Sequence, residues 1–97
     1  MSRKPSKHDH DRSEVWERAD LSAAVGETMA AIGKNLRGIR VRKGYSQEQL
    51  AERAGLHAKH VQRLETGANN TTVASLVALA AGLEVKIEAF FRPPRSK

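Results

Sequence analysis

The side chains best suited to chemistry lie in residues 58–66, where basic and apolar residues recur at helical spacing. Val61 and Leu64 share one face of a helix, and at about 100° per residue Lys59 and Arg63 point away from it. Both cationic side chains donate hydrogen bonds, and guanine O6 and N7 are suitable acceptors. This segment therefore predicts a helix that presents donors to nucleic acid. The alternative is that both side chains form an ordinary solvated face.

The charge of the chain is concentrated around this segment. The net charge is +6, from 17 basic and 11 acidic residues, and residues 34–63 hold eight basic residues against two acidic ones. Such a stretch attracts polyanions, chiefly nucleic acid or an anionic membrane surface. A solubilising surface is the alternative that charge alone leaves open.

Composition excludes several classes of function. Cysteine is absent, so disulfides, thiolate nucleophiles and cysteine metal sites are excluded. The His-Asp run at 8–11 is a poor metal site, and we expect no metal, no cofactor and no enzymatic activity. The start of the chain is polar, and the longest apolar run, residues 73–83, is too short to cross a bilayer. We therefore expect no membrane association and a cytoplasmic location.

The apolar pattern predicts an all-α fold. Residues 26–92 form the expected domain, and its first helix carries an apolar face and ends near residues 43–44. Ser46 and Gln49 form a capping box for a second helix, Gly55 forms a turn, and a third helix covers 58–65. The apolar face of the first helix comprises Met29, Ile32, Leu36 and Ile39.

The remaining segments are assigned from simpler signals. A fourth helix over 73–81, apolar nearly all round, is expected to be the most buried and to end at Gly82. A short fifth helix over 86–91 is expected to pack its apolar residues on the bundle. Residues 1–25 are expected to be an extension: a flexible arm followed by an extra helix over 13–24 that Gly26 ends or hinges. Residues 93–97 form a basic tail.

Two short helices joined by a turn that contains glycine form a helix-turn-helix unit. The segment LRGIRVRKGYSQEQLAERAGLHAKHVQRLETG, followed by TTVASLVALAAGLEVKIEAFF, resembles the phage-repressor/Cro type of this unit, often called the XRE family. The resemblance covers roughly residues 32–91. It implies a five-helix domain that binds double-stranded palindromic operator DNA as a homodimer.

Candidate DNA-contacting residues follow from the helical geometry and from this resemblance. If the first turns of the third helix enter a DNA groove, four residues of that helix face the edges of the bases. The resemblance places the family's base-contacting positions on three of these four, Ala58, Lys59 and Arg63. The complete expected base-contacting set is Ala58, Lys59, Gln62 and Arg63. The expected phosphate-contacting set is Gln47, His57, Thr66, Asn69 and Asn70, and turn formation is an equal alternative for the two asparagines. The resemblance also implies a structural ion pair between Arg40 and Glu65.

Several partners and functions remain open at this stage. The fifth helix with Phe90 and Phe91 is the leading dimer surface, Trp16 is the second, and core packing is the alternative for both. The short domain also resembles stand-alone controller proteins of restriction–modification systems, and the residues that carry this resemblance are Thr72, Ser75-Leu76 and Phe90-Phe91. The competing functions are an antitoxin that binds a toxin through residues 1–25 as well as its own operator, and a protein-interaction module of the same fold.

Overall fold

The structure is a computed structural model that describes residues 18–68 and 71–93. These residues form four α-helices and one 3₁₀ helix, with no strand among them, which confirms the all-α prediction. The elements are α2 (Arg18–Lys43), α3 (Gln47–Ala54), α4 (Ala58–Thr66), α5 (Val73–Leu83) and η1 (Ile87–Phe91).

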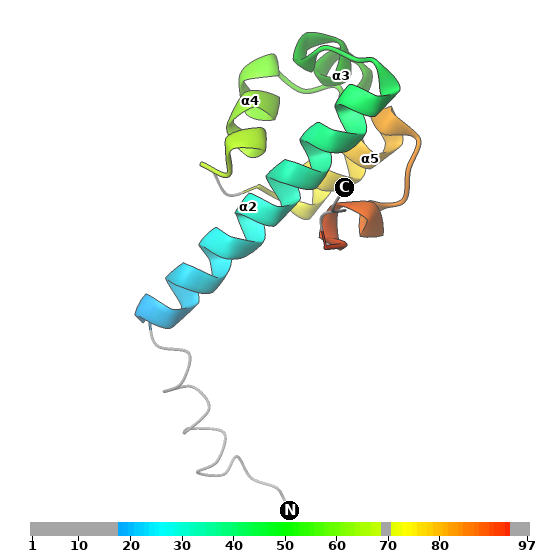
Figure 1. The fold of residues 1–97 in the computed structure, drawn as a ribbon. Helices are drawn as coiled ribbons and strands as arrows, with labels where there is room; N and C mark the ends of the chain where they lie inside the picture. The colour runs from blue at the N-terminus through cyan, green and yellow to red at the C-terminus, as the bar shows by residue number, and fades with distance from the viewer. Residues whose placement is uncertain (1–17, 69–70, 94–97) are drawn as a thin grey trace, which may run out of the picture.

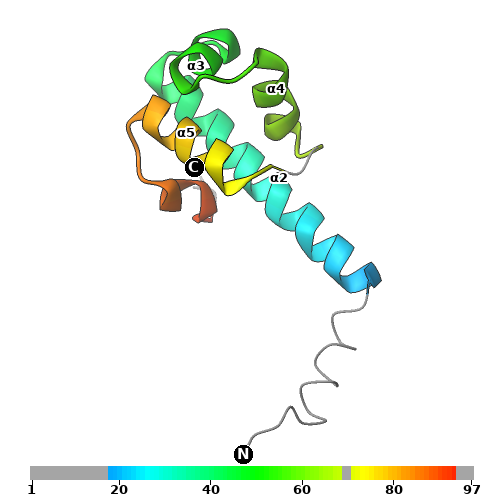
Figure 2. The same cartoon turned by 180° about the vertical axis from the view of Figure 1, so that it is seen from behind.

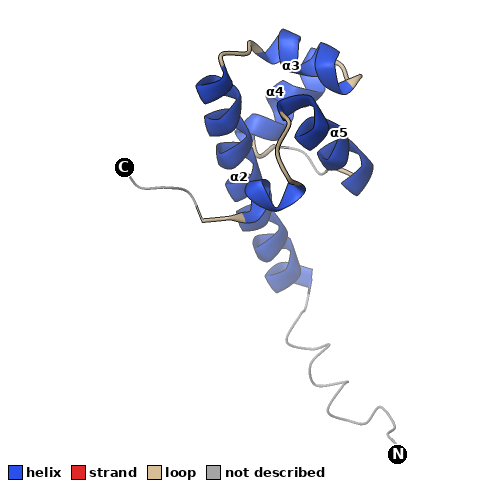
Figure 3. Cartoon of the chain, turned by 90° about the vertical axis from the view of Figure 1, so that its right-hand side faces the viewer, coloured by secondary structure: helices blue, strands red, loops and turns tan. Residues whose placement is uncertain are grey.

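The short helices pack around the C-terminal half of α2 (Figure 1). In that view α4 and η1 lie on opposite sides of α2 and α5 lies behind it, so that α5 is in front of α2 in the view from behind (Figure 2). The first turns of α2 extend beyond the bundle, as Figure 3 also shows. Each helix contributes apolar side chains to one core, whose fully buried members are Leu36, Leu50, Val61, Leu64, Leu79, Leu83 and Phe90.

Helix α2 differs from the sequence prediction at its start. It runs without interruption through Gly26, so the expected helix over 13–24 with an end or hinge at Gly26 is wrong for the residues described. The physical reason is composition: Gly26 lies between two pairs of alanines, at 23–24 and 30–31, and alanine is the strongest helix former, which offsets the cost of glycine of about 1 kcal/mol. Residues 18–25 are therefore continuous with the first helix of the domain.

A second glycine of α2 has a packing role that the sequence did not suggest. A β-carbon on Gly33 would collide with the carbonyl oxygen of Leu64 and would lie 2.9 Å from that of Glu65. Only glycine allows the backbones of α2 and α4 to approach this closely. Gly33 therefore sets the position of the C-terminal end of α4.

Helix α5 is less buried than its composition predicts. Thr72 caps it as expected, its Oγ1 accepting a hydrogen bond from the backbone of Ser75. However, Val73 and Val77 are 70% and 51% exposed, so the helix buries one face rather than its whole circumference. An apolar composition gives no periodicity from which to predict the buried face.

The end of α5 also lies beyond the predicted position. Gly82 is buried inside the helix, against Leu50, Arg53 and Ala54 of α3, and the left-handed capping residue is Glu84, with φ of 60°. Gly82 is thus a packing glycine and does not break the helix.

The predicted fifth helix is present as the 3₁₀ helix η1. Phe90 is fully buried in the core, whereas Phe91 is 53% exposed and does not pack wholly on the bundle as predicted. Phe90 is therefore unavailable for a dimer surface.

Some of the sequence predictions fall outside the described residues. These are the predictions for Trp16, the His-Asp run at 8–11, Asn69, Asn70 and most of the basic tail. Within 18–68 and 71–93, none of the helices combines the length and hydropathy needed to cross a bilayer.

Candidate nucleic-acid interface

The start of α3 is fixed by its own sequence. The Ser46 hydroxyl accepts a hydrogen bond from the backbone N–H of Gln49 at 2.9 Å, and the Gln49 side chain accepts one from the backbone N–H of Ser46 at 2.8 Å. This reciprocal pair is the predicted capping box. At the other end, Gly55 adopts φ of 72° and begins the turn to α4. Local chemistry thus determines both ends of the first helix of the motif.

Helix α4 presents its basic face to solvent. Val61 and Leu64 are 0% and 1% exposed and anchor the helix in the core, while Lys59, Gln62 and Arg63 are exposed. This is the orientation that the helical spacing predicts. The surface of α4 available to a ligand is therefore dominated by two cations and an amide. Ala58, the fourth member of the expected base-contacting set, is half-buried against the core.

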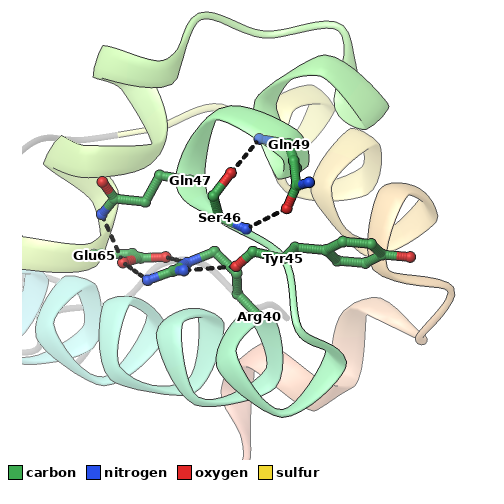
Figure 4. Close-up of polar contacts among 6 residues, drawn as sticks. All are labelled: Arg40, Tyr45, Ser46, Gln47, Gln49 and Glu65. Atoms are coloured by element: carbon green, nitrogen blue, oxygen red, sulfur yellow. Dashed lines mark hydrogen bonds and ion pairs between the residues drawn. The ribbon is translucent and has the colours of Figure 1, made fainter.

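An ion pair and its hydrogen bonds join three elements behind this face (Figure 4). Arg40 of α2 donates from Nε to Glu65 Oε2 at 2.6 Å and from Nη2 to Glu65 Oε1 at 3.1 Å. Its Nη1 donates to the carbonyl oxygen of Tyr45 at 2.8 Å, and Gln47 Nε2 donates to Glu65 Oε1 at 2.9 Å. The side chains of Arg40 and Glu65 are only 11% and 3% exposed. The network holds α2, α3 and α4 in one arrangement.

The electrostatic effect of this pair matters for an anionic ligand. Glu65 is the only acidic residue of α4, and Arg40 offsets its charge at hydrogen-bond distance. The exposed cations Lys59 and Arg63 therefore determine the sign of the charge on the outer surface of the helix.

The bond from Gln47 to Glu65 is a feature that the sequence analysis missed. Gln47 is the first residue of α3 and Glu65 lies near the end of α4, so no local spacing signals the contact. A half-buried amide held by a carboxylate is oriented by it. Gln47 therefore lies at the start of α3, with its Nε2 committed to the network.

Of the other four expected phosphate-contacting residues, the structure describes His57 and Thr66. His57 occupies the position before α4 in extended conformation and is exposed, without a side-chain hydrogen bond that caps the helix. Thr66 is exposed, and its hydroxyl donates to the carbonyl oxygen of Arg63 at 2.9 Å. Asn69 and Asn70 are outside the described residues. His57 and Thr66 therefore lie at the two ends of α4, next to its exposed face.

Comparison with known proteins assigns this arrangement to a family. The family model described as helix-turn-helix matches residues 36–90, which include all of α3 and α4. The chain belongs to this helix-turn-helix family. The resemblance noted in the sequence is thereby confirmed, and the matched range contains Arg40 and Glu65 as well as the residues of α4.

Three similar proteins illustrate the relationship. A hypothetical transcription factor of Neisseria meningitidis is 34% identical over 68 residues, which are 70% of this chain and 64% of that protein. The control protein C.SmaI of Serratia marcescens is 36% identical over 56 residues, 58% of this chain and 67% of that protein. The crystal structure of the restriction-modification controller protein C.AhdI from Aeromonas hydrophila has 33% identity and a TM-score of 0.64, covering 65% of this chain and 96% of that one. The chain spans less than two thirds of the length of several of the relatives it matches.

Proposed function

We propose that this helix-turn-helix protein is a transcriptional regulator that binds a specific sequence of double-stranded DNA. The observation that carries the proposal is the exposed face of α4, where Lys59, Gln62 and Arg63 project from a helix anchored by buried apolar residues. A helix with this arrangement of donors fits the major groove and hydrogen-bonds to base edges there. The names of the similar proteins, transcription factor and control protein, support the same function.

The roles of the individual residues follow from their positions. Arg63 is proposed to contact guanine O6 and N7 with two hydrogen bonds, with Lys59 and Gln62 beside it and Ala58 against a thymine methyl group. The first turn of α3, with Gln47, and residues His57 and Thr66 are proposed to contact phosphate. Because Gln47 is bound to Glu65, we propose that it acts mainly by placing the backbone N–H groups of α3. Asn69 and Asn70 remain proposed phosphate contacts.

A homodimer on a palindromic operator is part of this proposal. One α4 contacts only a few base pairs, and two copies one helical turn apart, about 34 Å, double the sequence that is recognised. Among the exposed large apolar residues, which also include Leu21, Val25 and Val41 of α2, we propose Phe91 and the edge of α5 formed by Val73 and Val77 as the dimer surface. Sedimentation of Phe91→Glu and Val77→Glu tests them separately, and a dimer that survives both substitutions contradicts this assignment.

The proposal is tested by selecting binding sites from random double-stranded DNA and measuring affinities by fluorescence anisotropy. Arg63→Ala is expected to lose about 1–3 kcal/mol on the selected site and to relax preference at one base pair. Lys86→Ala is the matched control, because Lys86 is also an exposed cation and precedes η1, on the other side of α2. If both variants lose affinity equally, or if Arg63→Ala keeps its sequence preference, the assigned face is wrong.

A further inference from the structure

A groove runs between α2 and η1, away from the face of α4 that is proposed to contact DNA. It consists of two adjoining cavities of about 450 and 310 Å³, which share Ile39, Arg42, Ala89 and Arg92 in their walls. Asn35 fixes the width of the groove, since its Nδ2 donates to the carbonyl oxygens of Phe90 at 2.8 Å and Arg92 at 2.6 Å. These bonds tie the end of η1 to α2.

The groove combines positive charge with an apolar floor. Ile39 is buried, and Val85 and Ala89 are half-buried against the core. Four exposed cationic side chains surround this floor, and no aspartate or glutamate is among the residues that line the two cavities. The cationic residues are Lys34, Arg42, Lys43 and Arg92. The groove therefore favours a ligand that is both anionic and apolar.

The groove faces away from α4. Gly33 packs against the end of α4, whereas Asn35 bonds to η1. Two residues further along an α-helix correspond to a rotation of about 200°, so these two contacts lie on nearly opposite sides of α2. Figure 1 shows the same separation of α4 and η1. A DNA duplex lying along α4 therefore leaves the groove accessible.

We propose that this groove binds an acidic peptide segment of a partner protein, in which aspartate or glutamate alternates with apolar residues. In an extended peptide, successive side chains point to opposite sides, so one set faces the apolar floor while carboxylates on the other set reach the cationic rim. A sugar-phosphate backbone matches the charge but has no apolar side chains for the floor. From Lys34 to Lys43 the helix rises about 14 Å, which corresponds to about four residues of extended peptide.

The experiment uses the full chain and a fluorescein-labelled synthetic peptide of about eight residues, alternating glutamate with leucine or phenylalanine. We expect saturable binding that weakens as salt is added. Arg42→Glu is expected to weaken binding about tenfold or more, because it places a carboxylate against the carboxylates of the peptide. Arg63→Glu makes the same charge change on α4 and is expected to leave peptide binding intact while abolishing DNA binding.

Two further arms separate this proposal from other ligands and from the proposed function. A peptide with serine in place of leucine and phenylalanine is expected to bind at least about tenfold more weakly, and equal binding would mean that the groove attracts any polyanion. A double-stranded oligonucleotide of the selected site is expected not to displace the peptide, and displacement would assign the groove to nucleic acid. Equal losses of peptide binding in Arg42→Glu and Arg63→Glu would overturn the proposal, even if the DNA-binding function stands.

Discussion

The buried ion pair between Arg40 and Glu65 allows a quantitative test of what holds the motif together. Arg40→Met keeps a long side chain but removes the guanidinium, and leaves the Glu65 carboxylate, 3% exposed, with the single hydrogen bond from Gln47. Breaking one partner of a buried pair costs about 3–5 kcal/mol. Because Gln47 still donates and Arg40 is 11% exposed, we expect the lower end of that range, about 3 kcal/mol.

The measurement is urea unfolding followed by far-ultraviolet circular dichroism. The exposed pair of Arg53 and Glu84, at 3.4 Å with side chains 38% and 75% exposed, provides the control. Glu84→Gln is expected to change the free energy of unfolding by no more than about 0.5 kcal/mol, because solvent screens this pair.

The double variant Arg40→Met, Glu65→Leu completes the test. Replacing both charges is expected to recover much of the loss, since no buried charge is then left without a partner. A cost below about 1 kcal/mol for Arg40→Met, or a double variant as unstable as the sum of the single ones, would refute the reasoning.

Four further substitutions are predicted for the same unfolding assay. Gly33→Ala is expected to lower the free energy of unfolding by about 1–3 kcal/mol, because its methyl group meets the backbone of α4. Gly26→Ala is expected to raise the free energy of unfolding by about 0.5–1 kcal/mol, because an added β-carbon there would meet no atom within 4 Å beyond its chain neighbours and the local helix backbone. A change of the same sign for both glycine variants would contradict the packing role of Gly33. Ser46→Ala is expected to cost about 1 kcal/mol through loss of the capping box, and an unchanged midpoint would show that the cap adds nothing. Glu84→Gly is expected to raise stability by about 0.5 kcal/mol by relieving a left-handed φ, whereas a loss would show that the contact with Arg53 outweighs the strain.

The helix-turn-helix motif was predictable because its signals are local. The side chains of Ser46 and Gln49 each accept a hydrogen bond from the backbone N–H of the other residue, within one helical turn. Gly55 needs only its own conformational freedom to form the bend. The orientation of α4 was predictable for a related reason: Val61 and Leu64 fix its buried face, and the helical period then places Lys59 and Arg63 outside.

The sequence predictions were wrong at positions where the local signal was weak or where the conformation depends on contacts with other helices. Gly26 and Gly82 look like helix breaks in the sequence, but one lies among helix-forming alanines and the other is a packing contact with α3. Val77 has the same composition around it as buried residues of α5, and only the packing of α5 in the bundle decides that it is exposed. Glu84 takes a left-handed conformation that its residue type does not favour.

The amino-acid sequence by itself determined the helices of the motif, its caps and the outward direction of the basic side chains, because each depends on residues within a few positions of one another. Tertiary structure alone decided which distant groups meet: Gln47 with Glu65, Gly33 with the end of α4, and Arg92 with the cations of α2 across an apolar floor. The physical reason is that these contacts depend on how helices far apart in the chain pack, and neither local propensity nor periodicity specifies that packing.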